Sequence, residues 1–254
     1  MNRFSPVFFL ILFFNTSIFG QNTDSTQKTS TFSGAIGITN NGFSIVPSFS
    51  LNSPALLFNG AFRKKKFSFE PDFRLAMDAK NGGLIWWFRY QIVQHKKFGI
   101  RTGVHPALTI IKRQVTENGK TSEISELLRF AAFEVVPGYQ INKHFGVSAM
   151  YLQGNGLQDH GPQVTRVLFL NTSITNVSLN QNLMLYTFPT VYYLYTDGFT
   201  GSYFTGTVGL VHKKWPVSLQ SSINQTFKSN VPGNKDFMWN VTLNYNFKRI
   251  INRY

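Results

Sequence analysis

The sequence contains no cysteine and few charged residues. Among its 254 residues, charged side chains make up 14%, against about a quarter in an ordinary soluble domain. The lack of cysteine excludes a disulfide framework, a thiolate metal site and a cysteine nucleophile. Aromatic residues reach 16%, with 26 Phe. A chain with little charge and many aromatic side chains cannot easily cover itself with a hydrated surface, so the composition favours a non-aqueous environment.

Long hydrophobic runs are also missing. The apolar stretch at 7–14 is about eight residues long, whereas a membrane-spanning helix needs about 20. This stretch follows a basic start at Arg3 and precedes smaller residues up to Gly20, which is the pattern of a secretory signal peptide. We therefore expect residues 1–20 to be a cleaved signal peptide, residues 21–31 to be a polar periplasmic leader, and residues 32–254 to form one domain.

Apolar and polar residues alternate with period two through most of this domain. In the terminal segment, Phe237, Trp239 and Val241 oppose Asn240 and Thr242. Such alternation indicates β-strands with two different faces. It predicts about twelve strands, at 43–51, 56–63, 67–77, 84–93, 98–112, 127–141, 145–152, 164–178, 183–195, 203–211, 217–227 and 237–247, with 32–38 as a weaker extra strand.

A soluble β-sandwich also alternates, but two features favour a barrel in a membrane. The polar face consists mostly of Ser, Thr, Asn, Gln and Gly, which suits a crowded, wet interior better than a fully solvated surface. Short and long connections alternate down the chain, as they do in outer-membrane barrels. We therefore predict an all-β, antiparallel, up-and-down transmembrane β-barrel of about twelve strands, with apolar side chains facing lipid and their neighbours facing a wet lumen.

The terminal segment carries a family resemblance. Val241, Leu243, Tyr245 and Phe247 alternate with polar residues, and this run resembles the closing-strand assembly signal of Gram-negative outer-membrane β-barrel proteins. Residues 248–254 extend beyond it, which departs from the usual pattern. The resemblance covers the chain in pattern only. It implies this architecture and an outer-membrane location, with no specific family or substrate.

Most of the positive charge falls on the predicted short turns. The chain has a formal net charge of +14, yet no basic helix or zinc spacing points to nucleic acid. A basic periplasmic rim would attract the anionic headgroups of outer-membrane lipid or an anionic periplasmic partner. The alternative is that these side chains only keep the strand ends hydrated. The predicted rim residues are Arg63, Lys64, Lys65, Lys66, Lys96, Lys97, Lys213 and Lys214.

A second group of charges lies on the polar face inside the strands. We expect the hairpin of 67–93 to bring Asp72 near Arg89, and the next turn to bring Arg89 beside Arg101. Such a belt could filter ions across a lumen, or it could be a set of internal salt bridges that plugs a narrow barrel. The candidate lumen constriction comprises Glu70, Asp72, Arg74, Arg89, Arg101, His105 and Glu134.

The sequence favours a narrow, porin-like channel for small hydrophilic solutes. A non-conducting accessory barrel of an envelope complex is the second hypothesis, and a lipid-modifying outer-membrane enzyme is the third. The five histidines form no recognisable catalytic or metal-binding motif. We therefore expect no enzymatic activity, no cofactor and no metal.

Overall fold

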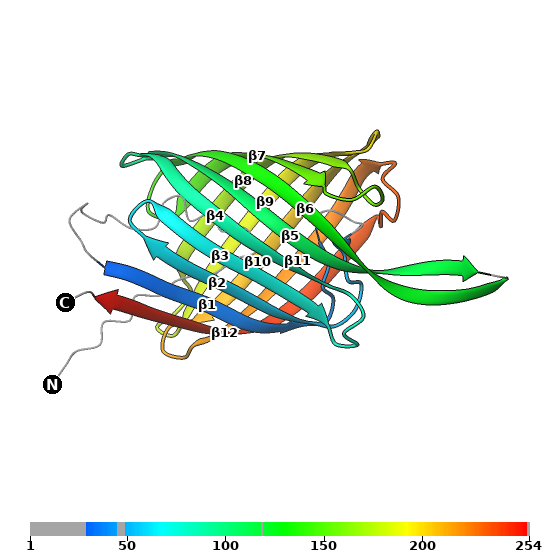
Figure 1. Ribbon diagram of the computed structural model, residues 1–254. Coiled ribbons are helices and arrows are strands. Elements are labelled where there is room, and N and C mark those ends of the chain that lie inside the picture. Colours follow the sequence, from blue (N-terminus) through cyan, green and yellow to red (C-terminus); the bar gives the residue numbers. More distant parts are fainter. Residues whose placement is uncertain (1–28, 45–48, 118, 253–254) are drawn as a thin grey trace.

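The computed structural model describes residues 29–44, 49–117 and 119–252, and these form a closed antiparallel β-barrel (Figure 1). The predicted signal peptide at 1–20 and leader residues 21–28 lie outside the described residues. No helix in the described part is long and apolar enough to cross a membrane. The strands are β1 (Thr29–Thr39), β2 (Ala55–Lys64), β3 (Phe67–Ala76), β4 (Gly82–Gln94), β5 (Phe98–Glu117), β6 (Lys120–Gln140), β7 (Phe145–Gly156), β8 (Val164–Ser178), β9 (Leu183–Thr196), β10 (Phe199–His212), β11 (Val217–Ser229) and β12 (Phe237–Asn252).

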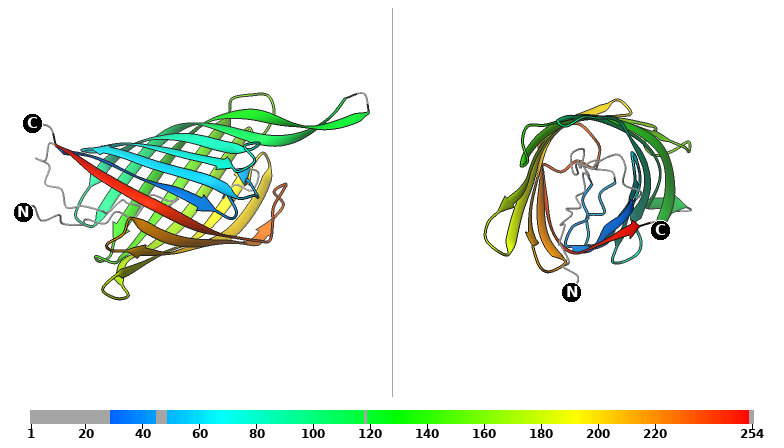
Figure 2. Two further views of the ribbon diagram at one scale, coloured as in Figure 1. Left: turned by 90° about the horizontal axis from the view of Figure 1, so that it is seen from below. Right: turned by 90° about the vertical axis from the view of Figure 1, so that its left-hand side faces the viewer.

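Each strand pairs with its neighbours in the chain, and β1 closes the ring by pairing with β12. The view along the barrel axis shows this ring (Figure 2). Within the barrel wall, a closed ring leaves no strand edge without a partner, which is what a β-structure needs in hydrocarbon. The predicted fold class is confirmed.

The two ends of the barrel differ. At the end where β1 begins and β12 ends, short turns such as 65–66 and 95–97 join the strands. The longer connections, such as 157–163 and 230–236, lie at the opposite end. The longest joins β1 to β2, and we call its described residues, 40–44 and 49–54, L1. The β5–β6 hairpin projects well beyond the barrel at this opposite end (Figure 1).

Period two places alternate side chains outside and inside the barrel. On β8, Leu168 and Leu170 are 49% and 56% exposed, whereas Phe169 between them is 2% exposed. On β12, Trp239 is exposed and its neighbours Met238 and Asn240 are buried. The outer surface is therefore apolar on strands from all around the barrel, because every second residue points away from the lumen.

The assignment of the first wall strand was wrong. Residues 32–38 lie in β1, and the described part of 43–51 belongs to L1. L1 turns into the barrel, where Leu51 packs with Ala55, Leu57 and Ala76. The apolar residues of L1 alternate as strand residues do, but they are buried against the inner wall. The true strand gave a weak pattern because Gly34 and its neighbours contribute little side chain.

Gly34 has a structural role at the seam between β1 and β12. It lies opposite Phe247 in the register, and a Cβ atom on Gly34 would lie 2.3 Å from the Phe247 ring. The absent side chain lets the ring lie across β1, between Phe32 and Phe58, with ring centroids 5.5 and 6.5 Å away. An aromatic cluster thus covers the closing seam.

Candidate functional site

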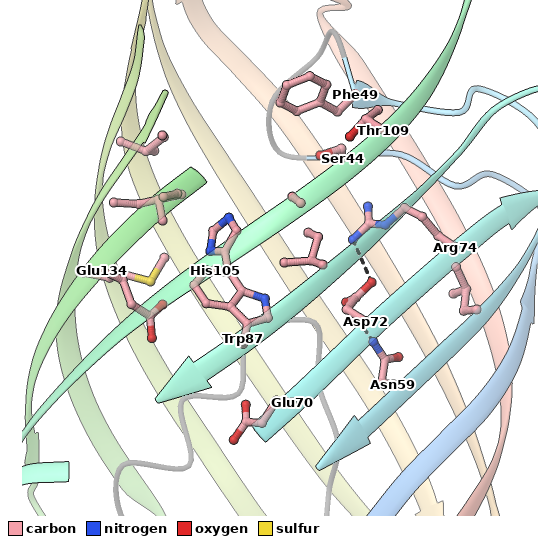
Figure 3. A pocket seen from close by; sticks show the side chains of 18 of the residues that line it. Ser44, Phe49, Asn59, Glu70, Asp72, Arg74, Trp87, His105, Thr109 and Glu134 are labelled. Carbon is pink, nitrogen blue, oxygen red and sulfur yellow. Dashed lines mark hydrogen bonds and ion pairs between the residues drawn. The ribbon is translucent and has the colours of Figure 1, made fainter. Parts of the chain in front are cut away.

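The lumen holds a cavity of about 250 Å³ between L1 and the barrel wall (Figure 3). L1 contributes Phe43, Ser44 and Phe49 to its lining, and the wall contributes residues from β2 to β12. The Nδ2 atom of Asn81 donates a 3.0 Å hydrogen bond to the carbonyl of Leu51, which fixes the base of L1. The cavity is therefore bounded by a loop that the barrel itself anchors.

A buried ion-pair network runs along one wall from β2 to β6. Arg89 on β4 donates hydrogen bonds to Glu70 on β3 and to Glu134 on β6, the latter from Nε at 2.7 Å. Arg101 Nε lies 3.4 Å from Glu134 Oε1, and Arg63 Nη2 lies 2.9 Å from Glu70 Oε1. The side chains of Glu70 and Glu134 are 4% and 0% exposed. Buried charges require such mutual pairing because burial removes their hydration.

Gly103 makes the network possible. In the strand register it stands opposite Arg89 on one side and Glu134 on the other. A Cβ atom at this position would lie 2.9 Å from Arg89 Cγ and 3.2 Å from Glu134 Oε1. Because β5 has no side chain at this point, Arg89 can reach across it from β4 to β6.

An aromatic shelf lies against the network. The guanidinium carbon of Arg89 lies 4.0 Å from the centroid of the Trp87 ring, within the range of a cation–π contact. The ring of His105 lies on Trp87 with centroids 3.8 Å apart. Both rings line the cavity, as the close view shows (Figure 3). The inner wall therefore changes at Trp87 from charged side chains to aromatic ones.

A smaller polar group lies beside this shelf. Asp72 accepts a 2.8 Å hydrogen bond from Asn59 Nδ2 and lies 3.5 Å from Nη2 of Arg74 (Figure 3). The side chains of Asp72 and Arg74 are each 15% exposed. They are thus more accessible than Glu70, Arg89, Arg101 and Glu134, and they are the charged groups of the cavity lining best placed to meet a solute.

The opposite side of the cavity is apolar. Met150, Val167 and Phe169 line it and belong to a buried hydrophobic cluster. Phe49 of L1 packs against Phe130 with ring centroids 5.0 Å apart. The expectation that the inner face is mostly polar is therefore wrong at these positions on β6 to β8. At residues 167–170 of β8 both faces are apolar, so alternation alone could not distinguish the inside from the outside there.

The predicted lumen residues come together, and Arg89 lies beside Arg101 as predicted, but the predicted pairing of Asp72 with Arg89 is wrong. Asp72 stands opposite Ile85, and Glu70 rather than Asp72 contacts Arg89. Arg89 and Arg101 lie on adjacent strands and share Glu134. All seven candidates line the cavity: Glu70, Asp72, Arg74, Arg89, Arg101, His105 and Glu134.

The predicted rim residues lie at the ends of strands or in turns where β1 begins and β12 ends. Lys64, Lys65 and Lys66 are exposed. Lys213 donates hydrogen bonds to Ser178 Oγ and to the carbonyl of Asn180. Arg63 differs from the others because its guanidinium group belongs to the Glu70 network. The remaining members, Lys96, Lys97 and Lys214, are exposed.

Sequence reasoning missed the aromatic half of the site. Trp87 shares its strand face with Arg89, and Phe130 shares its face with Glu134, so alternation does contain a signal for their inward position. Phe169 lies between Leu168 and Leu170, and there the pattern does not say which apolar face is internal. The inward position of Phe49 depends on the fold of L1. Within the described ranges, no group of three or more His, Asp or Glu side chains could hold a metal ion.

A closed antiparallel barrel with an even number of strands, short turns at one end and an apolar outer surface is the architecture of Gram-negative outer-membrane β-barrels. The KdgM porin shares the fold, at 10% identity and a TM-score of 0.51, with 85% of this chain and 99% of the porin covered. An outer membrane channel from Pseudomonas putida F1 aligns over 89% of this chain and 96% of its own, at 11% identity and a TM-score of 0.47. The beta domain of the Bordetella autotransporter BrkA aligns over 87% and 99%, at 8% identity and a TM-score of 0.49.

At 10% identity, the likeness to the KdgM porin concerns the fold. The sequence matches no protein-family model and no curated protein.

Proposed function

We propose that this chain is an outer-membrane channel for small solutes that carry hydrogen-bonding groups. The observation that carries the proposal is the internal cavity of about 250 Å³, which lies inside a closed barrel and is bordered by L1. The inner face of β11 and β12 supports passage of polar groups, since it presents Ser222, Asn224, Asn240 and Thr242. The narrower expectation from the sequence, that the solutes are small and hydrophilic, stays a prediction.

The outer surface supports residence in a lipid bilayer. Side chains such as Leu170, Val191 and Leu243 are about half exposed on the outside of the barrel, and a contiguous apolar surface of this kind is unusual on a soluble monomer. We propose that lipid covers it, after export through the predicted signal peptide. In this orientation the basic rim faces the periplasm, where it would meet anionic headgroups or an anionic partner.

Within the lumen, the buried charged residues and the more exposed ones suggest different roles. The network of Glu70, Arg89 and Glu134 holds the wall together, because its members satisfy one another and are nearly inaccessible. Asp72 and Arg74 are the constriction residues that a permeating solute or ion would meet. This assigns ion selectivity to the more exposed pair.

Planar-bilayer recording of the purified barrel tests this function. We expect discrete conductance steps, with a shift toward cation selectivity in Arg74→Glu. Lys80→Glu makes the same change of charge at an exposed position outside the lumen and should leave selectivity near that of the parent protein. A folded barrel that inserts into bilayers and passes no current contradicts the proposal.

A silent barrel would favour the accessory role instead. The feature that favours this second function is the projecting β5–β6 hairpin, which offers a surface beyond the barrel (Figure 1). Residues 111–117 and 120–126 pair with each other, and no third strand pairs with them in the described part of the chain. That the chain is not an enzyme stays a prediction.

A further inference from the structure

The lining of the lumen cavity points to the kind of molecule that it would bind. Its apolar side combines the rings of Phe49, Phe130 and Phe169 with the flexible side chain of Met150. Aromatic and thioether groups of this kind pack against rings and short aliphatic chains. A cavity of about 250 Å³ lies just below the range of about 300–1,000 Å³ that is usual for drug-sized ligands. The space therefore fits a molecule with a single ring.

The charges of the residues that line the cavity cancel. The carboxylates that line it belong to Glu70, Asp72 and Glu134, and each one is paired with an arginine that also lines it. These arginines are Arg74, Arg89 and Arg101. A charged solute would have to give up its hydration without gaining an uncompensated counter-charge. An uncharged solute avoids this cost.

The cavity also has hydrogen-bonding atoms to offer. His105 Nδ1 and Asn240 Oδ1 are buried without a hydrogen-bond partner among the described residues, and both side chains belong to the lining. Buried polar atoms without partners are uncommon in folded proteins. The His105 ring is held against Trp87, so its polar edge lies beside an aromatic surface. A ligand with a ring and one hydroxyl group would match both features.

From this lining we propose that the lumen cavity is a binding site for small, uncharged, amphipathic molecules, with one aromatic or aliphatic ring and a hydroxyl group that pairs with His105. The proposal rests on the channel function above and specifies the class of solute. The ring occupies the space beside Phe130 and Phe169, and Trp87 forms one side of the site.

Binding of 4-fluorophenol to the purified full-length barrel in detergent, followed by ¹⁹F NMR, tests the site. 4-Fluorobenzoate supplies a charged match, and 2-deoxy-2-fluoroglucose supplies a hydrophilic one. We expect saturable binding of 4-fluorophenol beyond its partition into empty micelles, and at least tenfold weaker binding of the other two. Absence of saturable binding, or equal binding of all three probes, overturns the proposal.

Two adjacent alanines give a matched pair of variants. Ala132 lines the cavity beside His105, whereas Ala131 is exposed on the outer face of the same strand. Ala132→Phe should fill the site and weaken 4-fluorophenol binding at least tenfold. Ala131→Phe adds the same ring on the outside and should leave binding unchanged. Equal affinities in the two folded variants would place the ligand elsewhere and refute the site.

His105→Phe tests the polar contact and provides an answer even if Ala132→Phe does not fold. The variant keeps a ring against Trp87 but removes Nδ1. Binding of 4-fluorophenol should weaken about three- to tenfold, the usual effect of one neutral hydrogen bond, while binding of 4-fluorotoluene should be unchanged. Equal losses for both probes, or no loss for either, contradict the assigned contact.

The binding assay and the channel recording can fail independently. Binding of 4-fluorophenol by a barrel that passes no current supports the site and contradicts the channel. Conductance without binding supports the channel and refutes the site.

Discussion

Replacement of Glu134 by glutamine should strongly destabilise the barrel. The Glu134 side chain is 0% exposed and lies 2.7 Å from Arg89 Nε and 3.4 Å from Arg101 Nε. Glutamine has nearly the same shape, so the change removes charge without making a cavity. It leaves three arginines, Arg63, Arg89 and Arg101, around the single carboxylate of Glu70.

The size of the effect follows from the burial of this pair. Removal of one partner from a buried ion pair usually costs about 3–5 kcal/mol. Because about 1.4 kcal/mol corresponds to a tenfold change in an equilibrium constant, the folding constant should fall by a factor of about 100 to several thousand. Urea titration of the barrel in lipid vesicles, followed by tryptophan fluorescence, measures the free energy of unfolding.

Glu123→Gln is the matched control. It makes the same substitution on the same strand, but Glu123 pairs with Lys80 at 3.3 Å where their side chains are 37% and 59% exposed. An exposed pair is worth less than about 1 kcal/mol, so this variant should unfold close to the parent protein. If Glu134→Gln were no more destabilising than Glu123→Gln, the network would not be a stabilising feature of the wall.

Three further changes test other parts of the structure. Gly103→Ala should lower the free energy of unfolding by about 1–3 kcal/mol through overpacking. Gly154→Ala is the control, because its Cβ atom would lie 3.6 Å from its nearest neighbour and should lower that free energy little. Equal losses of the two variants in urea titrations would refute the crowding at Gly103. Phe49→Ala removes the ring that packs on Phe130 and should raise single-channel conductance if L1 narrows the lumen; an unchanged conductance contradicts that role. A hydrogen bond from Lys112 lowers the pKa of Asp78 from its ordinary value of 3.8, so this bond stabilises the hairpin base above that pH and is lost as the pH falls through the lowered pKa. Protection factors for hydrogen exchange at the hairpin base, which correct for the intrinsic pH dependence of exchange, should therefore fall as the pH is lowered from 6 to 3 in the parent protein and fall less in Asp78→Asn; identical pH profiles of the protection factors would contradict the linkage.

The sequence was sufficient to predict the barrel because the alternation on strands such as β12 has one clearly apolar and one clearly polar face. It was not sufficient at L1, where Phe49 and Leu51 alternate like strand residues but are buried by the inner wall. The same ambiguity applied to residues 167–170 of β8, where both faces are apolar. In such a strand only the neighbouring strands determine which face is internal.

The charged group on the polar face was also predictable, but its pairing was not. A shift of two residues decides whether Glu70 or Asp72 meets Arg89, and that register depends on the turn at 77–81. The role of Gly103 could not be predicted, because the sequence does not show which side chains of the neighbouring strands cross a glycine in β5. Trp87 and Phe130 share strand faces with Arg89 and Glu134, but the inward position of Phe49 depends on the fold of L1, which no local pattern contains.

The seam where Phe247 lies over Gly34 has a consequence for biogenesis. The residues that seal the ring are separated by almost the whole length of the chain, and contacts between such distant segments form slowly. Until they form, two unpaired sheet edges and many apolar side chains stay available for aggregation. Folding of this polypeptide should therefore depend on chaperones that shield it before insertion and on assembly factors that promote the pairing of β1 with β12.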